Sequence, residues 1–309
     1  MPEKDSGITQ ELVQQWVTEE TTGVFSLSGL ALRMGLESRK QRMSLGVALN
    51  RLCKDTPTKK AIIKASGKKD GVYQILDVEP DEIDWQEAED VPVDLILPFG
   101  MHNMVEIYEK SIIIVAGTSN VGKTAYLYNF ILDNMAVHLI DLYNTETSPG
   151  QMRRRMNMMA AAKGMEIPNP APWKTLDRYD NFEDVLHPDH ISVIDYLEIT
   201  EDFYFIGRDI KRMWRKLNQG VLLIALQKGD PYKDKKGNPV YKDLAIGGQF
   251  TKHKAQLYLS FDYTNNPSMV RGKIVKAKVY NGQNPNNRTF TFSIDRGVML
   301  EDTFSWDVE

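Results

Sequence analysis

The segment from Gly117 to Thr124 constrains the fold of this chain most, because it matches the pattern G-x-x-x-x-G-K-[ST] without a gap. The preceding residues, 111–116, are apolar and rich in β-branched side chains, which is typical of a buried parallel strand. The following residues, 125–132, can continue as a helix. A strand, a glycine-rich loop and a helix in this order surround a phosphate with backbone N–H groups. The sequence therefore predicts a nucleoside triphosphate site on an α/β sheet.

Each part of this loop has an expected role. Gly117 and Gly122 permit a tight turn that points backbone N–H groups inward. Lys123 is expected to reach the β- and γ-phosphates, and the Thr124 hydroxyl is expected to ligate Mg²⁺. The predicted nucleotide-binding residues are Gly117, Thr118, Ser119, Asn120, Val121, Gly122, Lys123 and Thr124. The alternative is a glycine-rich turn that precedes a lysine by chance, and both flanks disfavour it.

Three further apolar segments each deliver a polar residue at or just beyond their carboxyl end. They are residues 136–143, 190–197, which carries Asp195 near its carboxyl end, and 221–226. Ligands of open α/β sheets bind at the carboxyl ends of the strands. Asp195 is placed to hold Mg²⁺ opposite Thr124, Glu146 to polarise the attacking water, and Gln227 to sense the γ-phosphate. Taken separately, Glu146 and Gln227 are equally well explained as ordinary loop residues, but their shared position favours a site.

These segments together resemble the RecA-like ATPases, and within them the ATPase domain of the DnaB replicative helicases and related phage proteins. The resemblance is carried by residues 117–124, 145–153, 193–198 and 224–227. It covers roughly residues 95–295, and Ile194–Leu197 is its most family-specific part. It implies a mostly parallel twisted sheet flanked by helices, hydrolysis of ATP with Mg²⁺, a catalytic role for Glu146, and a homo-oligomer.

The segment 272–282 resembles the late strand with which this family presents a lysine and an arginine to the ATP of the next subunit. Lys278 fits the lysine and joins Lys123, Glu146 and Gln227 as an expected catalytic residue. Tyr280 occupies the arginine position, which departs from the family pattern. The alternatives for the missing arginine are Arg271 and Arg288.

Charge is segregated along the N-terminal third, although the whole chain has a net charge of only −4. Residues 24–76 contain eleven Lys or Arg and three Asp or Glu, whereas residues 77–94 contain nine Asp or Glu and no Lys or Arg. Such segregation suggests a basic module joined to the ATPase by an acidic connector. We expect three regions, namely a DNA-binding domain at 1–76, an acidic linker at 77–98 and a RecA-like ATPase domain at 99–309.

The basic module resembles a winged helix-turn-helix domain. Residues 9–17, 25–36 and 39–52 are expected to form helices, and residues 61–65 and 72–76 a hairpin with a basic tip. The third helix would enter the major groove of duplex DNA, and the tip would lie against phosphates. The expected contacts are Arg39, Lys40, Arg42, Lys64, Lys68 and Lys69. A winged helix used for protein contacts, or a solvated basic face, is the alternative.

A second DNA contact is expected in residues 228–248, which follow Gln227 and are rich in Gly, Pro and Lys. Two tyrosines there could stack on the bases of a single strand while lysines neutralise phosphates. The lysines concerned are Lys233, Lys235 and Lys236. A flexible hairpin without a DNA contact is equally compatible with this segment. Residues 163–190 contain four prolines, so we expect little regular structure there.

Other features narrow the class of protein. No apolar run approaches the ~20 residues of a membrane span, and the N-terminal residues do not form a secretory signal. The single cysteine excludes an internal disulfide. We therefore expect a cytoplasmic protein of a bacterial, archaeal or phage-infected cell, with replication or recombination proteins as candidate partners and no membrane.

Three functions are compatible with the sequence. The first is a DNA-binding ATPase that drives or regulates DNA remodelling in replication, recombination or mobile-element biology, and the set Lys123, Glu146, Asp195 and Gln227 favours it. The second is an ATP-switched DNA-bound regulator or helicase loader with slow hydrolysis, which Tyr280 favours. The third, a small-molecule phosphotransferase, lacks a recognisable acceptor pocket and gives the basic module no role.

Overall fold

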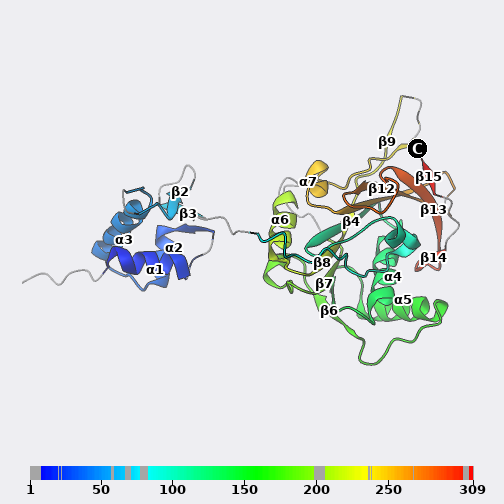
Figure 1. Cartoon of the computed structure of the whole chain (residues 1–309), viewed down its shortest axis with the longest axis horizontal. Coiled ribbons are helices and arrows are strands. Elements are labelled where there is room, and N and C mark those ends of the chain that lie inside the picture. The colour runs from blue at the N-terminus through cyan, green and yellow to red at the C-terminus, as the bar shows by residue number, and fades with distance from the viewer. Residues whose placement is uncertain are drawn as a thin grey trace, which may run out of the picture. The chain divides into compact units, whose positions relative to one another are not determined.

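The computed structural model of this chain describes residues 8–19, 21, 23–56, 59–66, 71–76, 83–197, 206–235, 237, 239–266, 268–301 and 306–308. The chain divides into two compact units, Met1–Glu89 and Asp90–Glu309, here called the N-terminal and C-terminal units (Figure 1). Each unit has its own core of buried apolar side chains. Among the described residues, no helix is long and apolar enough to cross a membrane.

The N-terminal unit packs helices against a small antiparallel sheet. Its elements are α1 (Gln10–Glu19), β1 (Val24–Ser26), α2 (Leu27–Arg33), α3 (Arg39–Leu52), β2 (Ile63–Ala65) and β3 (Val72–Ile75). The strand order is β1-β3-β2, so the expected hairpin forms and gains a third strand. That third strand shortens the helix expected from Phe25. Ser26 caps α2 by accepting a hydrogen bond from the Gly29 amide, while the Phe25 ring stacks on Tyr73.

The C-terminal unit is built on one large sheet. Its elements in chain order are η1 (Pro98–Asn103), β4 (Ser111–Gly117), α4 (Lys123–Asn134), β5 (Ile140–Asn144), α5 (Pro149–Ala162), β6 (Trp173–Asp177), η2 (Phe182–Asp184), β7 (Ile191–Asp195), α6 (Ile206–Lys216), β8 (Val221–Gln227), β9 (Tyr232–Lys233), β10 (Pro239–Val240), α7 (Gln249–Lys252), β11 (Leu257–Tyr263), β12 (Val270–Ala277), β13 (Arg288–Asp295), β14 (Met299–Glu301) and β15 (Asp307–Val308). The sheet order is β14-β13-β12-β11-β4-β8-β7-β5-β6, with β15 paired to β13.

The six strands from β11 to β6 are parallel, and β12, β13, β14 and β15 extend the sheet antiparallel to their neighbours. Every residue of β4 is buried, because α4 and α5 cover one face of the sheet and α6 covers the other (Figure 1). The predicted mostly parallel sheet flanked by helices is therefore confirmed. Because β4 lies between β8 and β11 rather than beside β5, its loop opens at a point where the strand order reverses, which is where ligands bind in such sheets.

The expectation of little regular structure in residues 163–190 was wrong for residues 173–177. These residues form β6, an edge strand that pairs in parallel with β5 along its whole length. The prolines at 168, 170 and 172 precede the strand and do not interrupt it. An edge strand needs only one neighbour, so a mostly exposed and polar segment can adopt it once β5 is in place.

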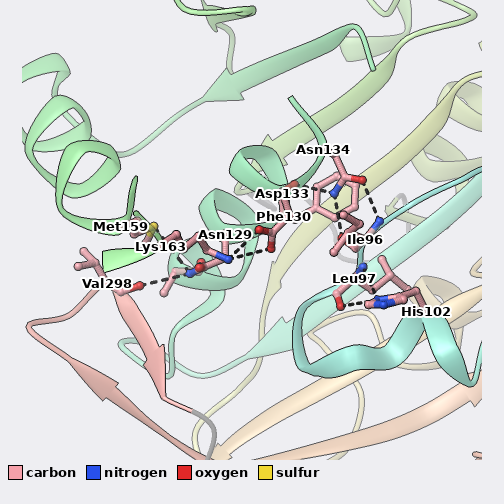
Figure 2. A network of polar contacts seen from close by, with 11 residues as sticks. Ile96, Leu97, His102, Asn129, Phe130, Asp133, Asn134, Met159, Lys163 and Val298 are labelled. Atoms are coloured by element: carbon pink, nitrogen blue, oxygen red, sulfur yellow. Dashed lines mark hydrogen bonds and ion pairs between the residues drawn. The ribbon is translucent and has the colours of Figure 1, made fainter. Parts of the chain in front are cut away.

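Residues 94–97, which we placed in the acidic linker, pack onto the C-terminal unit. Leu95 and Leu97 are buried, and the side-chain amide of Asn134 pairs with both the N–H and the C=O of Ile96 at 2.9 and 2.8 Å. His102 lies beside the backbone of Leu97 in the same network (Figure 2). The boundary between the two units accordingly follows Glu89.

Candidate functional site

The loop between β4 and α4 has the shape that its glycines predict. Gly122 has φ +87°, and a Cβ there would lie 2.6 Å from Cδ1 of Ile294. A Cβ on Gly117 would lie 2.5 Å from the side chain of Val121, which is fully buried beneath the loop. No larger residue fits either position without moving its neighbours. Glycine is therefore required at Gly117 by the neighbouring loop residues, and at Gly122 by the positive φ and by a side chain of β13.

Lys123, the first residue of α4, turns its side chain back into this loop. Its ammonium donates to the carbonyls of Gly117 and Thr118 at 2.9 and 2.8 Å, and to Oε1 of Gln227 at 3.0 Å. Burial lowers the pKa of Lys123 to about 8, although Asp195 and Glu146 oppose that shift. The lysine is thus held at the centre of the loop, where a phosphate group would meet it.

Thr124 and Asp195 come from different elements and meet beside this loop, here called the phosphate loop (residues 117–124). Thr124 ends the loop, and Asp195 ends β7. The Thr124 hydroxyl donates to Oδ1 of Asp195 at 3.1 Å. Asp195 is 1% exposed, and among the described residues its other oxygen, Oδ2, has no hydrogen-bond partner. Burial raises the pKa of Asp195 to about 6, and Glu146 adds to the shift while Thr124 and Lys123 oppose it.

A hydroxyl oxygen beside a carboxylate oxygen without a partner is the donor set that a hard divalent cation prefers. A bound cation would also remove the cost of burying that carboxylate. The residues present therefore fit Mg²⁺, which Thr124 and Asp195 would hold.

Thr145 is a positioning residue that the sequence analysis did not single out. Its hydroxyl lies 3.0 Å from the carbonyls of Asp195 and Tyr196 and accepts a hydrogen bond from the Tyr196 amide, also at 3.0 Å. It therefore fixes the end of β7 against the end of β5. Its neighbour Glu146 is exposed, and its charge acts on both Lys123 and Asp195. The sequence offered one signal of this positioning role, namely a threonine directly before the expected catalytic glutamate.

Gln227 connects the phosphate loop to the segment that follows β8. Its side chain accepts from Lys123 and donates to the Ser119 hydroxyl at 3.2 Å. Its carbonyl accepts the Ile246 amide at 3.0 Å, so residues 228–246 leave and return at Gln227. The structure thus brings Lys123, Thr124, Asp195 and Gln227 together at one sheet edge.

Lys228 is a buried cation beside this site that sequence reasoning missed. Its ammonium donates to Oδ1 of Asp262 at 2.5 Å and to the Ser260 hydroxyl at 2.8 Å. Burial lowers the pKa of Lys228 and raises that of Asp262, while each partner opposes the other's shift. A lysine tied in this way braces β8 against β11 and is not available to a phosphate.

Lys278 lies apart from these residues. It follows Ala277, which pairs with Leu257, which in turn pairs with Ile113 near the start of β4. Lys278 is thus at the amino edge of the parallel strands, whereas the phosphate loop is at the carboxyl edge. Of the two alternative arginines, Arg271 pairs opposite Asp262 at the carboxyl edge, and Arg288 donates to Gln283 at 2.6 Å.

The expected DNA contacts fall into two groups on the surface. Arg39, Lys40 and Arg42 are exposed on the first turn of α3, and Lys64 is exposed on β2. Lys233 and Lys235 are exposed at the β9–β10 hairpin. The remaining expected contacts, Lys68, Lys69 and Lys236, lie outside the described residues.

No protein-family model and no curated protein sequence matches this chain. Among solved structures, a DnaB-like replicative helicase, described with its interactions with primase, matches at 16% identity over 70% of this chain and 65% of that chain, with a TM-score of 0.50. The RadB recombinase matches at 14% identity over 64% and 93% of the two chains, with a TM-score of 0.46. A KaiC-like protein from Pyrococcus horikoshii matches at 13% identity over 68% and 98%, with a TM-score of 0.49.

Three observations indicate the same fold: the strand order of the sheet, the glycine-rich loop after β4 and the likeness to the DnaB-like helicase. The C-terminal unit has the RecA-like fold. At such low identity the likeness concerns the fold of this RecA-like core, and its activity has to be argued from its own residues.

Proposed function

We propose that this chain is an Mg²⁺-dependent ATP hydrolase that binds DNA and drives or regulates its remodelling in replication, recombination or mobile-element biology. The observation that carries the proposal is the convergence of Lys123, Thr124, Asp195 and Gln227 at the carboxyl edge of the sheet. A loop of backbone N–H groups and a buried lysine can bind the phosphates of a nucleotide, and a hydroxyl–carboxylate pair can hold the cation that accompanies them.

The residues have distinct roles in the proposed reaction. Lys123 binds the β- and γ-phosphates. Glu146 orients a water that attacks the γ-phosphorus and accepts its proton, while the bond from the γ-phosphorus to the bridging oxygen breaks and ADP leaves. Thr124 and Asp195 hold Mg²⁺, which when bound neutralises charge on the phosphate oxygens. Gln227 touches both Lys123 and Ser119, so a phosphate group that displaces these contacts would move it.

The test is ATP turnover by variants of the full chain. Lys123→Ala should lose nucleotide binding, whereas Glu146→Gln should keep binding and lose at least about 100-fold in kcat, because only the base is removed. Glu109→Gln, at an exposed glutamate of the same chain, is the matched control. Equal turnover by Glu146→Gln and the parent would remove Glu146 from this role.

The N-terminal unit is proposed to be a winged helix that binds duplex DNA. The order α1-β1-α2-α3-β2-β3 and the exposed cations on the first turn of α3 and on β2 support this assignment. Most of the attraction would be phosphate neutralisation, so log Kobs should fall with log salt by about 0.9 per phosphate contact. The double variant Arg39→Ala/Lys40→Ala should reduce that slope by the amount expected for about two phosphate contacts. An unchanged slope would favour a protein partner for this face.

A second candidate function is an ATP-switched DNA-bound regulator or helicase loader that hydrolyses ATP slowly. Tyr280 favours it, since it stands at the position from which the family resemblance predicts an arginine for the ATP of the next subunit. In the first function a second copy of the chain supplies Lys278 in a homo-oligomer. In the switch the chain works alone, so the dependence of ATP turnover on protein concentration separates the two candidates.

A further inference from the structure

Four cations from separate parts of the sequence gather around a fifth, Lys254, in the C-terminal unit. This basic cluster consists of Lys110, Lys211, Arg215, Lys254 and Lys278. Burial, and then the charges of the four others, lower the pKa of Lys254. Among the described residues none of the five has a carboxylate partner within 4.0 Å, in a chain whose overall charge is negative. A cluster of like charges without counter-charges fits an anionic ligand.

Trp214 organises the cluster. The Lys254 ammonium lies 3.7 Å from the centre of the indole ring, and that of Lys110 lies 5.1 Å from it. The indole N–H donates to the Lys110 carbonyl at 2.9 Å, which fixes the ring. Lys254 is therefore held in place before a ligand arrives, so little side-chain entropy remains to be lost on binding.

The basic cluster cannot reach the nucleotide of its own chain. Lys110 precedes β4, Lys254 precedes β11 and Lys278 follows β12, all at the amino edge of the parallel strands. The phosphate loop follows the other end of β4, seven residues away. At a rise of roughly 3.3 Å per residue the two edges are about 20 Å apart.

The phosphate site, in contrast, is short of positive charge. The charges that act on Asp195 are those of Lys123, Arg155 and Glu146, and Lys228 is tied to Asp262. Together with the carboxylate of Asp195 itself, these fixed charges roughly cancel, whereas a triphosphate carries more negative charge than one Mg²⁺ removes. The site is therefore incomplete without cations from elsewhere.

We infer that Lys254 is a second trans-acting cation, which together with Lys278 binds the triphosphate of a nucleotide held by a second copy of this chain. Lys254 then supplies the charge that an arginine at the position of Tyr280 would have supplied, and Trp214 acts as its positioning residue. A head-to-tail arrangement, with the carboxyl edge of one copy facing the amino edge of the next, brings the two charge patterns together. This inference rests on the proposed ATPase and on the trans role of Lys278.

The test uses the full chain and measures ATP turnover per subunit against protein concentration, together with ATP affinity in dilute protein. The parent's turnover should rise with concentration. Lys254→Ala should lose that rise by about 10- to 100-fold while its ATP affinity stays within about twofold of the parent's. Lys254→Arg should keep the rise, and Lys174→Ala, at an exposed lysine on β6, is the matched control. Mixing Lys254→Ala with Glu146→Gln should restore part of the rate, because mixed boundaries pair an intact Glu146 with an intact Lys254.

The outcomes separate this inference from the proposal beneath it. A parent rate that is flat with concentration overturns the trans assignments of both lysines and leaves the ATPase assignment to the Glu146 test. In another outcome, turnover per subunit rises with concentration in the parent and in Lys254→Ala but not in Lys278→Ala. That outcome overturns this inference alone. Weaker binding of single-stranded or duplex DNA by Lys254→Ala, with unchanged turnover, would make the basic cluster a nucleic-acid surface and also overturn it.

Discussion

At the residue scale, the candidate site stores an unfavourable charge. Asp195 is almost completely buried, receives one hydrogen bond from Thr124, and among the described residues has an unpartnered Oδ2. A carboxylate in such a position is destabilising by itself and becomes favourable only when a cation neutralises it. The residue is thus explained by ligand binding better than by the stability of the fold.

This charge predicts how stability depends on pH in the absence of Mg²⁺ and nucleotide. The pKa of Asp195 is raised from 3.8 to about 6 in the folded chain. The folded state therefore holds the proton more tightly, so the contribution of this group is complete below pH ~4 and is lost as pH rises through ~6, to a total of about 3 kcal/mol. Asp195→Asn should lack this component and, at neutral pH, be more stable than the parent by about 1–3 kcal/mol.

Urea unfolding of parent and Asp195→Asn across this pH range measures the effect as the difference between their free energies of unfolding. The same variant should lose Mg²⁺-dependent nucleotide binding, because an amide cannot replace the carboxylate charge. A difference that stays flat with pH would show that the carboxyl group is solvated in the folded state.

At the element scale, α4 has two functions. Its first turn carries Lys123 and Thr124 into the site, and its last residue, Asn134, holds the segment that precedes the core. The Asn134 amide bonds the Ile96 backbone twice and the Phe130 carbonyl at 2.7 Å, much as a neighbouring strand would (Figure 2). One helix therefore connects the phosphate site to the start of the C-terminal unit.

Asn134→Ala should lower the free energy of unfolding of the C-terminal unit by about 2–4 kcal/mol, because it leaves the Ile96 N–H and C=O without partners. Asn218→Ala, which removes an exposed amide bonded to Asp189, should cost less than about 1 kcal/mol. Hydrogen exchange of the Ile96 amide is the direct measurement. If that amide stays protected in Asn134→Ala, then Leu95 and Leu97 hold the segment without help.

At the scale of the whole molecule, the chain has two separate cores. One lies in residues 1–89, and the other lies on both faces of the large sheet of the C-terminal unit, so the two units can unfold separately. We therefore expect two thermal unfolding transitions for the full chain. Mg²⁺ with ATP should stabilise only the larger unit, by about 2.7 kcal/mol at 100 times Kd, and duplex DNA should raise the transition of the smaller one.

Differential scanning calorimetry of the full chain, with each ligand alone and with both, tests this expectation. A single transition that moves as one with either ligand would mean that the two units unfold cooperatively. The shift of the larger transition by ATP should disappear in Lys123→Ala, which links the calorimetric result to the proposed site.

The sequence by itself determined the parts of this protein that depend on local geometry. These parts show short-range patterns in the sequence. Gly122 is followed directly by a lysine and a threonine, and apolar strands end near Asp195 and Gln227. Because parallel strands deliver their carboxyl ends to one edge, the strand pattern alone is enough to place these residues together. The acidic and basic segments of the N-terminal third are likewise evident from the order of the residues.

Only the tertiary structure decided which strands are neighbours, and the remaining features depend on that. β1 and β6 are too short or too polar to be recognised alone and exist because β3 and β5 offer them hydrogen bonds. The buried Lys228–Asp262 pair joins residues 34 positions apart in the sequence. Sheet register places Lys278 at the edge opposite the phosphate loop, beside a lysine held by Trp214. Each of these is a long-range pairing, and the residues concerned carry no local pattern that reveals it.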